Sequence, residues 1–165
     1  MPEWARWESL QVRDLMKDLS APAALVTEGA SVEEVLRIMV EEPRTRHVYV
    51  VDAGKRLIGA IRMNAVIGYL FPYAGMRINT TEWVLGGLPL LSRVKITDLM
   101  DDRPRFVTPD TLLTEMAEIL MRDKINELPI VDADRRVIGQ LNVYDIIRFY
   151  LEHRPSGSPL PGGSS

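Results

Sequence analysis

The sequence contains the same stretch twice, 80 residues apart. In the second copy, residues 127–145 predict a strand, a tight turn, a second strand and the start of a helix, because two apolar runs flank a polar turn and apolar residues then recur three and four positions apart. The first copy matches it: 51–53 corresponds to 131–133, and 55–59 to 135–139. An internal duplication restricts the chain to a fold of two similar units, and its function is expected where they face each other.

A short leading motif precedes each copy. The two motifs, residues 12–16 and 96–100, lie 84 residues apart instead of 80, so the first copy holds four extra residues, which we place within 19–29. The predicted organisation is a leader (1–11), repeat 1 (12–70), a connector (71–95), repeat 2 (96–151) and a tail (152–165). The tail is rich in proline, glycine and serine and is expected to be disordered.

Each repeat is expected to contain a helix, two strands and a second helix, preceded by a short extended piece. In repeat 1, Ser31 is predicted to cap the first helix with Glu34 completing a capping box, and Pro43 to end it. In repeat 2, Asp110 or Thr111 is predicted to start the equivalent helix. The expected fold class is therefore α+β, with two repeats that each pack a small sheet against two helices.

The composition limits the function classes. A net charge of −3 argues against a nucleic-acid binder, which usually has a basic surface. The absence of cysteine excludes disulfides, thiolate catalysis and cysteine zinc sites, and the two histidines, His47 and His153, have no matching partners for a metal site. No segment approaches the apolar length of about 20 residues that a membrane-spanning helix needs. We expect a soluble, cytoplasmic protein.

Apolar residues also lie outside the repeats. The connector includes Trp83 and Leu85, which either fold back onto the core or form a partner surface. In the leader, Trp4 and Trp7 would share one face of a helix, where they pack on the body of the protein or on a partner.

Taken together, the repeats resemble a tandem pair of CBS (cystathionine β-synthase) domains, a Bateman module. The resemblance rests on an ordered set of motifs, Asp-Leu-Met, Leu-Pro-Ile-Val-Asp, Ile-Gly and Asp-Ile-Ile, whose pattern recurs in both copies. It implies that the two domains pack sheet to sheet with pseudo-twofold symmetry, form two clefts and dimerise. It also implies binding of adenosine-containing ligands, such as AMP, ADP, ATP or S-adenosylmethionine, and transmission of the signal to a partner protein.

The resemblance assigns a ribose site to repeat 2. The family's Gly-x-x-Thr/Ser-x-x-Asp pattern corresponds to residues 139–145, with Asp145 as the ribose ligand, Asn142 in the Thr/Ser position and Tyr144 beside them. In repeat 1, Ala65 replaces the aspartate, which leaves ribose recognition there in doubt. Asn142 and Asp145 are also suited to capping a helix, and the two roles are compatible.

The resemblance further implies contacts to phosphate and adenine. Arg46 and His47 of repeat 1 are expected to reach the phosphates of a ligand at Asp145, whereas Glu127 would repel a phosphate in the cleft at Ala65. Alternatively, Arg46 belongs to a solvated cluster of charges.

Val107, Thr108 and Pro109 are expected to flank the adenine, although Thr108 is equally suited to a turn before the proline. The sequence thus predicts one competent site per chain.

The leading hypothesis is a non-catalytic regulatory module for AMP, ADP or ATP, without a separate cofactor, that forms a homodimer and signals to an unknown protein partner. An enzyme is disfavoured because the sequence has no glycine-rich phosphate loop and no nucleophile paired with histidine. Two alternatives remain open, a binder of S-adenosylmethionine and a dimeric interaction scaffold without a small ligand.

Overall fold

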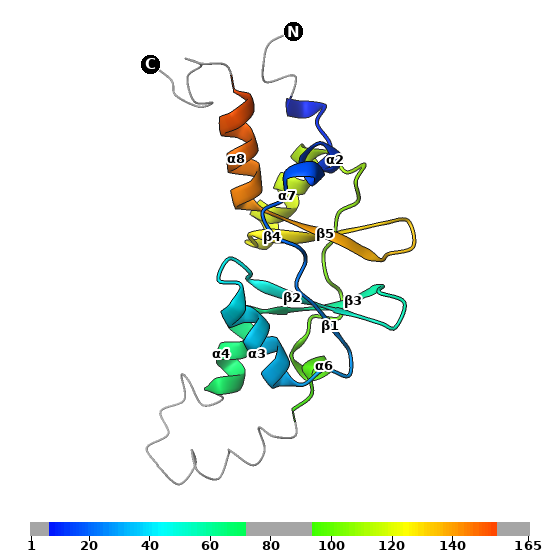
Figure 1. Ribbon diagram of the computed structural model, residues 1–165, viewed down its shortest axis with the longest axis vertical. Coiled ribbons are helices and arrows are strands. Elements are labelled where there is room, and N and C mark those ends of the chain that lie inside the picture. Colours follow the sequence, from blue (N-terminus) through cyan, green and yellow to red (C-terminus); the bar gives the residue numbers. More distant parts are fainter. Residues whose placement is uncertain (1–6, 72–93, 155–165) are drawn as a thin grey trace.

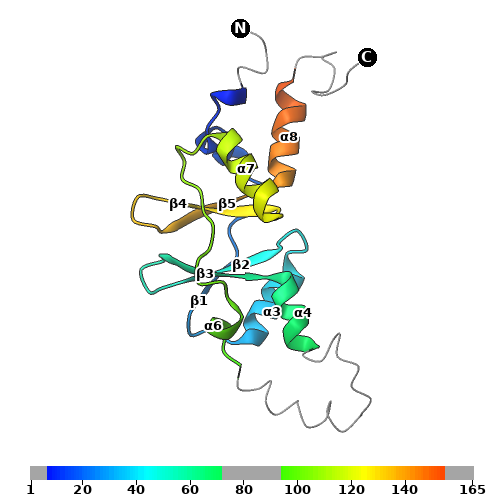
Figure 2. The same ribbon diagram turned by 180° about the vertical axis from the view of Figure 1, so that it is seen from behind.

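The computed structural model describes residues 7–71 and 94–154. Two small sheets lie face to face in the middle, and helices cover the outer face of each sheet (Figure 1). The view from behind shows the same four layers (Figure 2). Trp4 and the connector residues Trp83 and Leu85 lie outside the described residues, as does nearly all of the tail, so the predictions for them stay predictions.

Repeat 1 forms a three-stranded sheet. Its strands are β1 (Leu25–Thr27), β2 (His47–Val51) and β3 (Leu57–Arg62), in the order β1-β2-β3. β1 is parallel to β2, and β3 is antiparallel to it. Helices α3 (Val32–Glu41) and α4 (Met63–Leu70) cover the outer face (Figure 1).

Repeat 2 has the same order of elements. Antiparallel strands β4 (Glu127–Val131) and β5 (Val137–Asn142) pack against α7 (Leu113–Asp123) and α8 (Val143–His153). The counterpart of β1 is reduced to one parallel bridge, between Val107 and Ile130. Mixed helices and strands in two similar halves confirm the predicted α+β fold class.

The two hairpin turns have the same geometry. Lys55 and Arg135 have left-handed φ angles of 63° and 62°. In each turn one aspartate side chain, Asp52 or Asp132, accepts two backbone N–H bonds through Oδ1 at 2.8 to 2.9 Å. Such a side chain fixes the turn locally, so each hairpin has its register set by its own sequence.

The tips of the hairpins join the two sheets. Leu57 N donates to Arg135 O at 2.9 Å, and Val137 N donates to Lys55 O at 3.1 Å, a reciprocal pair between equivalent residues. Behind this pair an apolar cluster fills the space between the sheets. Its buried members are Tyr49, Val51, Leu57, Ala60, Val131 and Val137. Sheet-to-sheet packing of the repeats, which the resemblance implied, is present in the structure.

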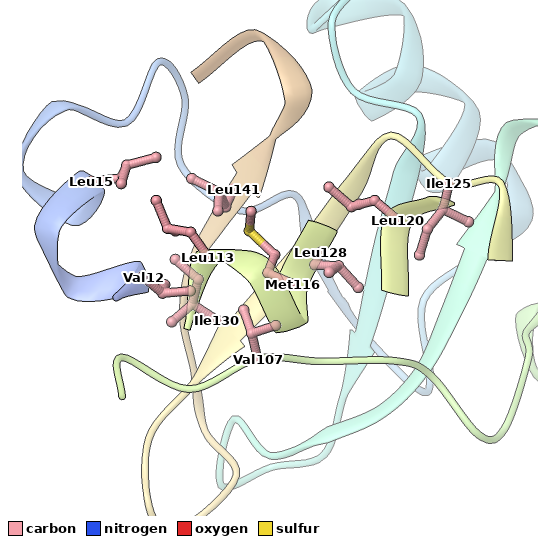
Figure 3. Packing of buried hydrophobic residues seen from close by; sticks show 10 residues of the cluster. All are labelled: Val12, Leu15, Val107, Leu113, Met116, Leu120, Ile125, Leu128, Ile130 and Leu141. Atoms are coloured by element: carbon pink, nitrogen blue, oxygen red, sulfur yellow. The ribbon is translucent and has the colours of Figure 1, made fainter. Parts of the chain in front are cut away.

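The leading helices pack on the opposite repeats. Val12 and Leu15 of α2 (Val12–Leu15) are buried in the core of repeat 2 (Figure 3), where Val12 N donates to Thr111 O at 2.9 Å. Ile96 of α6 (Ile96–Leu99) is fully buried in the core of repeat 1. Each core therefore contains a helix that the sequence order attaches to the other repeat.

One predicted cap is present and one is wrong. Ser31 Oγ accepts the Glu34 N–H at 3.2 Å and caps α3, as predicted. Helix α7 begins at Leu113 with Leu112 as its N-cap residue, not at Asp110 or Thr111. The reason is that Thr111 Oγ1 accepts the N–H of Thr108 at 3.0 Å and so stabilises a turn before the helix.

The described part of the leader packs on the protein's own body. The Trp7 ring meets Phe149 edge to face at a centroid distance of 5.7 Å and Tyr150 at 5.3 Å. Both partners belong to α8, so for Trp7 the first of the two alternatives is correct. The leader therefore contacts the C-terminal half of α8.

Candidate ligand site

Asn142 and Asp145 form a reciprocal cap at the N-terminus of α8. Asn142 Oδ1 accepts the Asp145 N–H at 2.9 Å, and Asp145 Oδ2 accepts the Asn142 N–H at 3.1 Å. Both residues are buried, with 8% and 3% of their surface exposed. The capping role that the sequence allowed is thus present. It places a buried carboxylate beside the positive end of a helix dipole.

The other oxygen of Asp145 binds a segment from repeat 1. Asp145 Oδ1 accepts the Ser20 N–H at 2.9 Å, and Asn142 Nδ2 donates to Ser20 Oγ at 3.3 Å. Arg148 Nη2 lies 3.7 Å from the same Oδ1. Sequence reasoning missed Ser20. The only signal was that it lies in the irregular segment that carries the four extra residues.

The N-terminus of α4, which is the equivalent position in repeat 1, is built differently. Its N-cap residue Arg62 makes no side-chain cap, and Ala65 leaves no carboxylate there. The space beside the equivalent glycine is also tighter. A Cβ on Gly59 would lie 2.4 Å from Met100 Sδ, whereas a Cβ on Gly139 would lie 3.3 Å from Leu19 Cδ1. The two repeats therefore differ in charge at the helix N-terminus and in space beside the glycine of the preceding strand.

A buried polar cluster joins the repeats beside these helix N-termini. Glu127 Oε1 lies 3.0 Å from His47 Nδ1 and accepts the backbone N–H of Arg46 at 2.8 Å. Glu127 Oε2 accepts from Gln140 Nε2 at 2.8 Å. Three donors on two repeats thus converge on one carboxylate, and Glu127 is only 2% exposed.

His47 and Glu127 are equivalent residues, 80 positions apart. The resemblance predicts opposite clefts for them, with His47 attracting phosphate in one and Glu127 repelling it in the other. The structure instead places them in contact, because the sheets face each other where both strands begin. The two side chains therefore lie at one position between the repeats, where His47 carries a charge only when it is protonated.

Tyr49 is packed against this cluster. Its ring is stacked on His47 at a centroid distance of 6.2 Å, and its buried hydroxyl has no hydrogen-bond partner among the described residues. Burial, and secondly the charge of Glu127, raise the pKa of Tyr49 well above its ordinary value of 10.0.

We expect Tyr49→Phe to keep or raise the free energy of unfolding by up to about 1 kcal/mol near neutral pH, since it removes an unpartnered polar atom. Above pH 10.0 the unfolded chain loses the Tyr49 proton while the folded chain keeps it, so stability contributed by this group falls as pH rises. Urea unfolding on both sides of that pH should show a smaller alkaline loss for Tyr49→Phe than for the exposed control Tyr144→Phe. Equal losses would contradict this role.

Three further predicted site residues lie elsewhere around the leading helix of repeat 1. Val107 is buried beside Ile130, and Pro109 O accepts the N–H of Arg13 in α2 at 3.0 Å. Thr108 Oγ1 lies 3.2 Å from Thr111 Oγ1, as in the turn that the sequence allowed. The hydrogen bonds thus tie Pro109 to α2 and Thr108 to the turn before α7, rather than to Asp145.

Tyr144 and Arg44 meet across the two repeats. The Arg44 guanidinium lies 4.8 Å from the centre of the Tyr144 ring, which is half exposed. Arg46 directs Nη1 to Met63 Sδ at 3.5 Å, at the start of α4. The structure therefore places Asn142, Asp145 and Tyr144 at the start of α8 with Arg44 of repeat 1 against Tyr144, whereas the side chain of Arg46 is directed to the start of α4.

In the described ranges, no group of three or more histidine, aspartate or glutamate side chains could hold a metal ion. None of the helices described here is long and apolar enough to cross a membrane.

Comparisons with known proteins agree with this arrangement. A curated relative is CBSX2, a chloroplastic CBS domain-containing protein of Arabidopsis thaliana, 26% identical over 140 residues and 78% of this chain. The crystal structure of CBSX2 in complex with AMP is similar over 86% of this chain and 96% of that one, with a TM-score of 0.65. A CBS domain-containing protein of Thermotoga maritima is 27% identical in sequence, with a TM-score of 0.68 over 88% of this chain and 97% of the other.

Another relative is a homoserine O-acetyltransferase of Methanohalobium evestigatum, 27% identical over 129 residues and 78% of this chain. This chain spans 22% of that protein's length and 58% of CBSX2. The CBS domain family itself matches residues 12–72 and 96–152, most of the sequence. The two matches coincide with the two repeats, and the chain belongs to the CBS domain family as a tandem pair.

Proposed function

We propose that this chain is a non-catalytic regulatory module that binds an adenine nucleotide, AMP, ADP or ATP, at the N-terminus of α8. The buried carboxylate of Asp145 is the observation that carries the proposal. A carboxylate can accept hydrogen bonds from both hydroxyls of a ribose, and the backbone N–H groups at a helix start favour the anionic part of a nucleotide. The related CBSX2, whose structure contains AMP, supports this ligand class.

The proposed contacts follow the sequence prediction. Asp145 and Asn142 bind the ribose, and Tyr144 lies beside them. Arg46 and His47 of repeat 1 contact the phosphates. Val107, Thr108 and Pro109 remain proposed neighbours of the adenine. Binding requires Asp145 to accept from the ligand in addition to Ser20 and Asn142, which its four lone pairs permit.

Signalling in this proposal passes through the join between the repeats. Ser20 of repeat 1 is bonded to Asp145 of repeat 2, and Glu127 is bonded to both repeats. A ligand that changes these bonds has differential affinity for two arrangements of the pair, which is the requirement for a regulatory effect.

A homodimer is also part of the proposal. Exposed apolar side chains recur at equivalent positions on the outer helices of both repeats or, for Phe71, directly after one of them. These pairs are Val40 with Met121, Ile67 with Ile147 and Phe71 with Leu151. A second copy of the chain could bury the exposed apolar side chains of both repeats in a single twofold interface.

Calorimetric titration of the chain with AMP, ADP, ATP, NAD and S-adenosylmethionine tests the proposal. We expect one phosphorylated adenine nucleotide to bind per chain. Binding of S-adenosylmethionine alone would favour the alternative ligand, and two nucleotides per chain would show that the α4 N-terminus is also competent. A folded chain that binds none of them would favour the interaction scaffold, since the bonds from Ser20 and Asn142 already satisfy Asp145 in that case.

A further inference from the structure

The carboxylate of Glu127 already holds the donors that lie between the two repeats. The ring of His47 and the backbone N–H of Arg46 both bond to its Oε1, and the Gln140 amide bonds to its Oε2. A ligand phosphate could use the first two donors only in competition with this resident anion. The Gln140 Oε1 atom is buried and has no hydrogen-bond partner among the described residues, so the cluster contains an unused acceptor, and Glu127 Oε2 takes one of the two N–H donors of that amide.

Glu127 is also close to the candidate ribose site. In the β4–β5 ladder it lies directly opposite Asn142, so their Cα atoms are about 5 Å apart. Asn142 is in turn bonded to Asp145 in both directions. Because phosphates are covalently attached to the ribose, those of a ligand held at Asp145 lie in the field of Glu127.

The buried His47 ring, 3.0 Å from Glu127 Oε1, is charged only when it is protonated, and the permanent positive charges near this position are more exposed. Arg46 is exposed to solvent, and the side chain of Arg148 is 33% exposed, whereas Glu127 is 2% exposed. Solvent and salt screen exposed charges, but a buried carboxylate keeps most of its field. The local field therefore disfavours each further negative charge on a ligand, although exposed arginines are present.

We infer that Glu127 is a specificity-determining residue that lowers affinity for each added phosphate, so that the chain prefers a nucleoside monophosphate to a triphosphate. This inference rests on the proposed function, since it needs a nucleotide at Asp145. The inference predicts how many phosphates the preferred ligand carries, which neither the sequence nor the family assignment determines. The residue acts through charge and by occupying donors, without direct contact with the ligand.

Glu127→Gln in the full chain is the test, read as the ratio of the Kd for ATP to the Kd for AMP. We expect a ratio above one in the original chain and a fall on the order of tenfold in Glu127→Gln, because one nearby charge is removed. The variant keeps an acceptor for His47 and Arg46. Its new amide can donate to Gln140 Oε1 after that amide turns over, so the fold is preserved.

Glu118→Gln is the matched control, because it removes an exposed carboxylate from α7 and should leave the ratio unchanged. Equal ratios in the original chain and Glu127→Gln would overturn the role of Glu127 while leaving nucleotide binding intact. A preference of the original chain for ATP over AMP would also overturn the role of Glu127. Failure of both folded proteins to bind AMP, ADP or ATP would reject the proposed function and this role together. Binding of ATP gained only in Glu127→Gln would support both.

Discussion

Replacing Ile96 with alanine is expected to lower the free energy of unfolding by about 3 kcal/mol and to loosen repeat 1, not repeat 2. Ile96 is fully buried and packs among Val35, Val48 and Ile61 of repeat 1, although it precedes repeat 2 in the sequence. Truncation removes buried methyl groups and leaves a cavity in that core. The loss is measurable by urea denaturation.

Hydrogen exchange locates the effect. In Ile96→Ala the amides of β2 and β3 should lose more protection than those of β4 and β5. Leu15→Ala is the matched variant, because Leu15 is buried in the core of repeat 2 while it precedes repeat 1. It should give the opposite pattern. If each variant instead weakened the repeat that follows it in the sequence, the exchanged packing of α2 and α6 would be incorrect.

Asp145→Ala should weaken AMP binding by about tenfold or more, because the ribose loses its charged acceptor. It should also lower the free energy of unfolding by about 2 kcal/mol, since the N–H groups of Ser20 and Asn142 lose their partner. Titration calorimetry and urea denaturation measure the two effects at a temperature where both proteins are folded.

Ser31→Ala separates the two effects. Ser31 caps α3 as Asp145 helps to cap α8, so its loss should cost about 1 kcal/mol of stability. Affinity for AMP should be unchanged in that control. Unchanged affinity in Asp145→Ala would reject the ribose assignment, and the residue would then be a helix cap that joins two repeats.

Local chemistry determined much of the fold in advance. The duplication placed both hairpins, since each turn depends on one aspartate that bonds to its own backbone, Asp52 or Asp132. The Ser31 cap and the Asn142–Asp145 cap are likewise contacts over three residues. Interactions of this kind depend on spacing along the chain, which a sequence displays directly.

The start of α7 shows where such reasoning fails. Asp110 and Thr111 have good capping side chains, but Thr111 bonds back to Thr108 and the helix begins at Leu113. A turn and a cap compete for the same hydroxyl, and their energies are similar in size. Which of them forms depends on how the preceding chain meets α2, through bonds such as Arg13 N to Pro109 O.

The sequence alone predicts two equivalent units that both mix strands with helices, and it shows that only the second carries an aspartate at the start of its last predicted helix. Three features become visible in the folded chain alone: α2 and α6 are exchanged between the cores, Ser20 binds Asp145, and His47 and Glu127 form one pair. The reason is that these contacts join residues far apart along the chain, for example 80 positions for His47 and Glu127 and 125 positions for Ser20 and Asp145. Their partners are chosen by how two sheets and their helices fill a shared interior, and no local spacing encodes that choice.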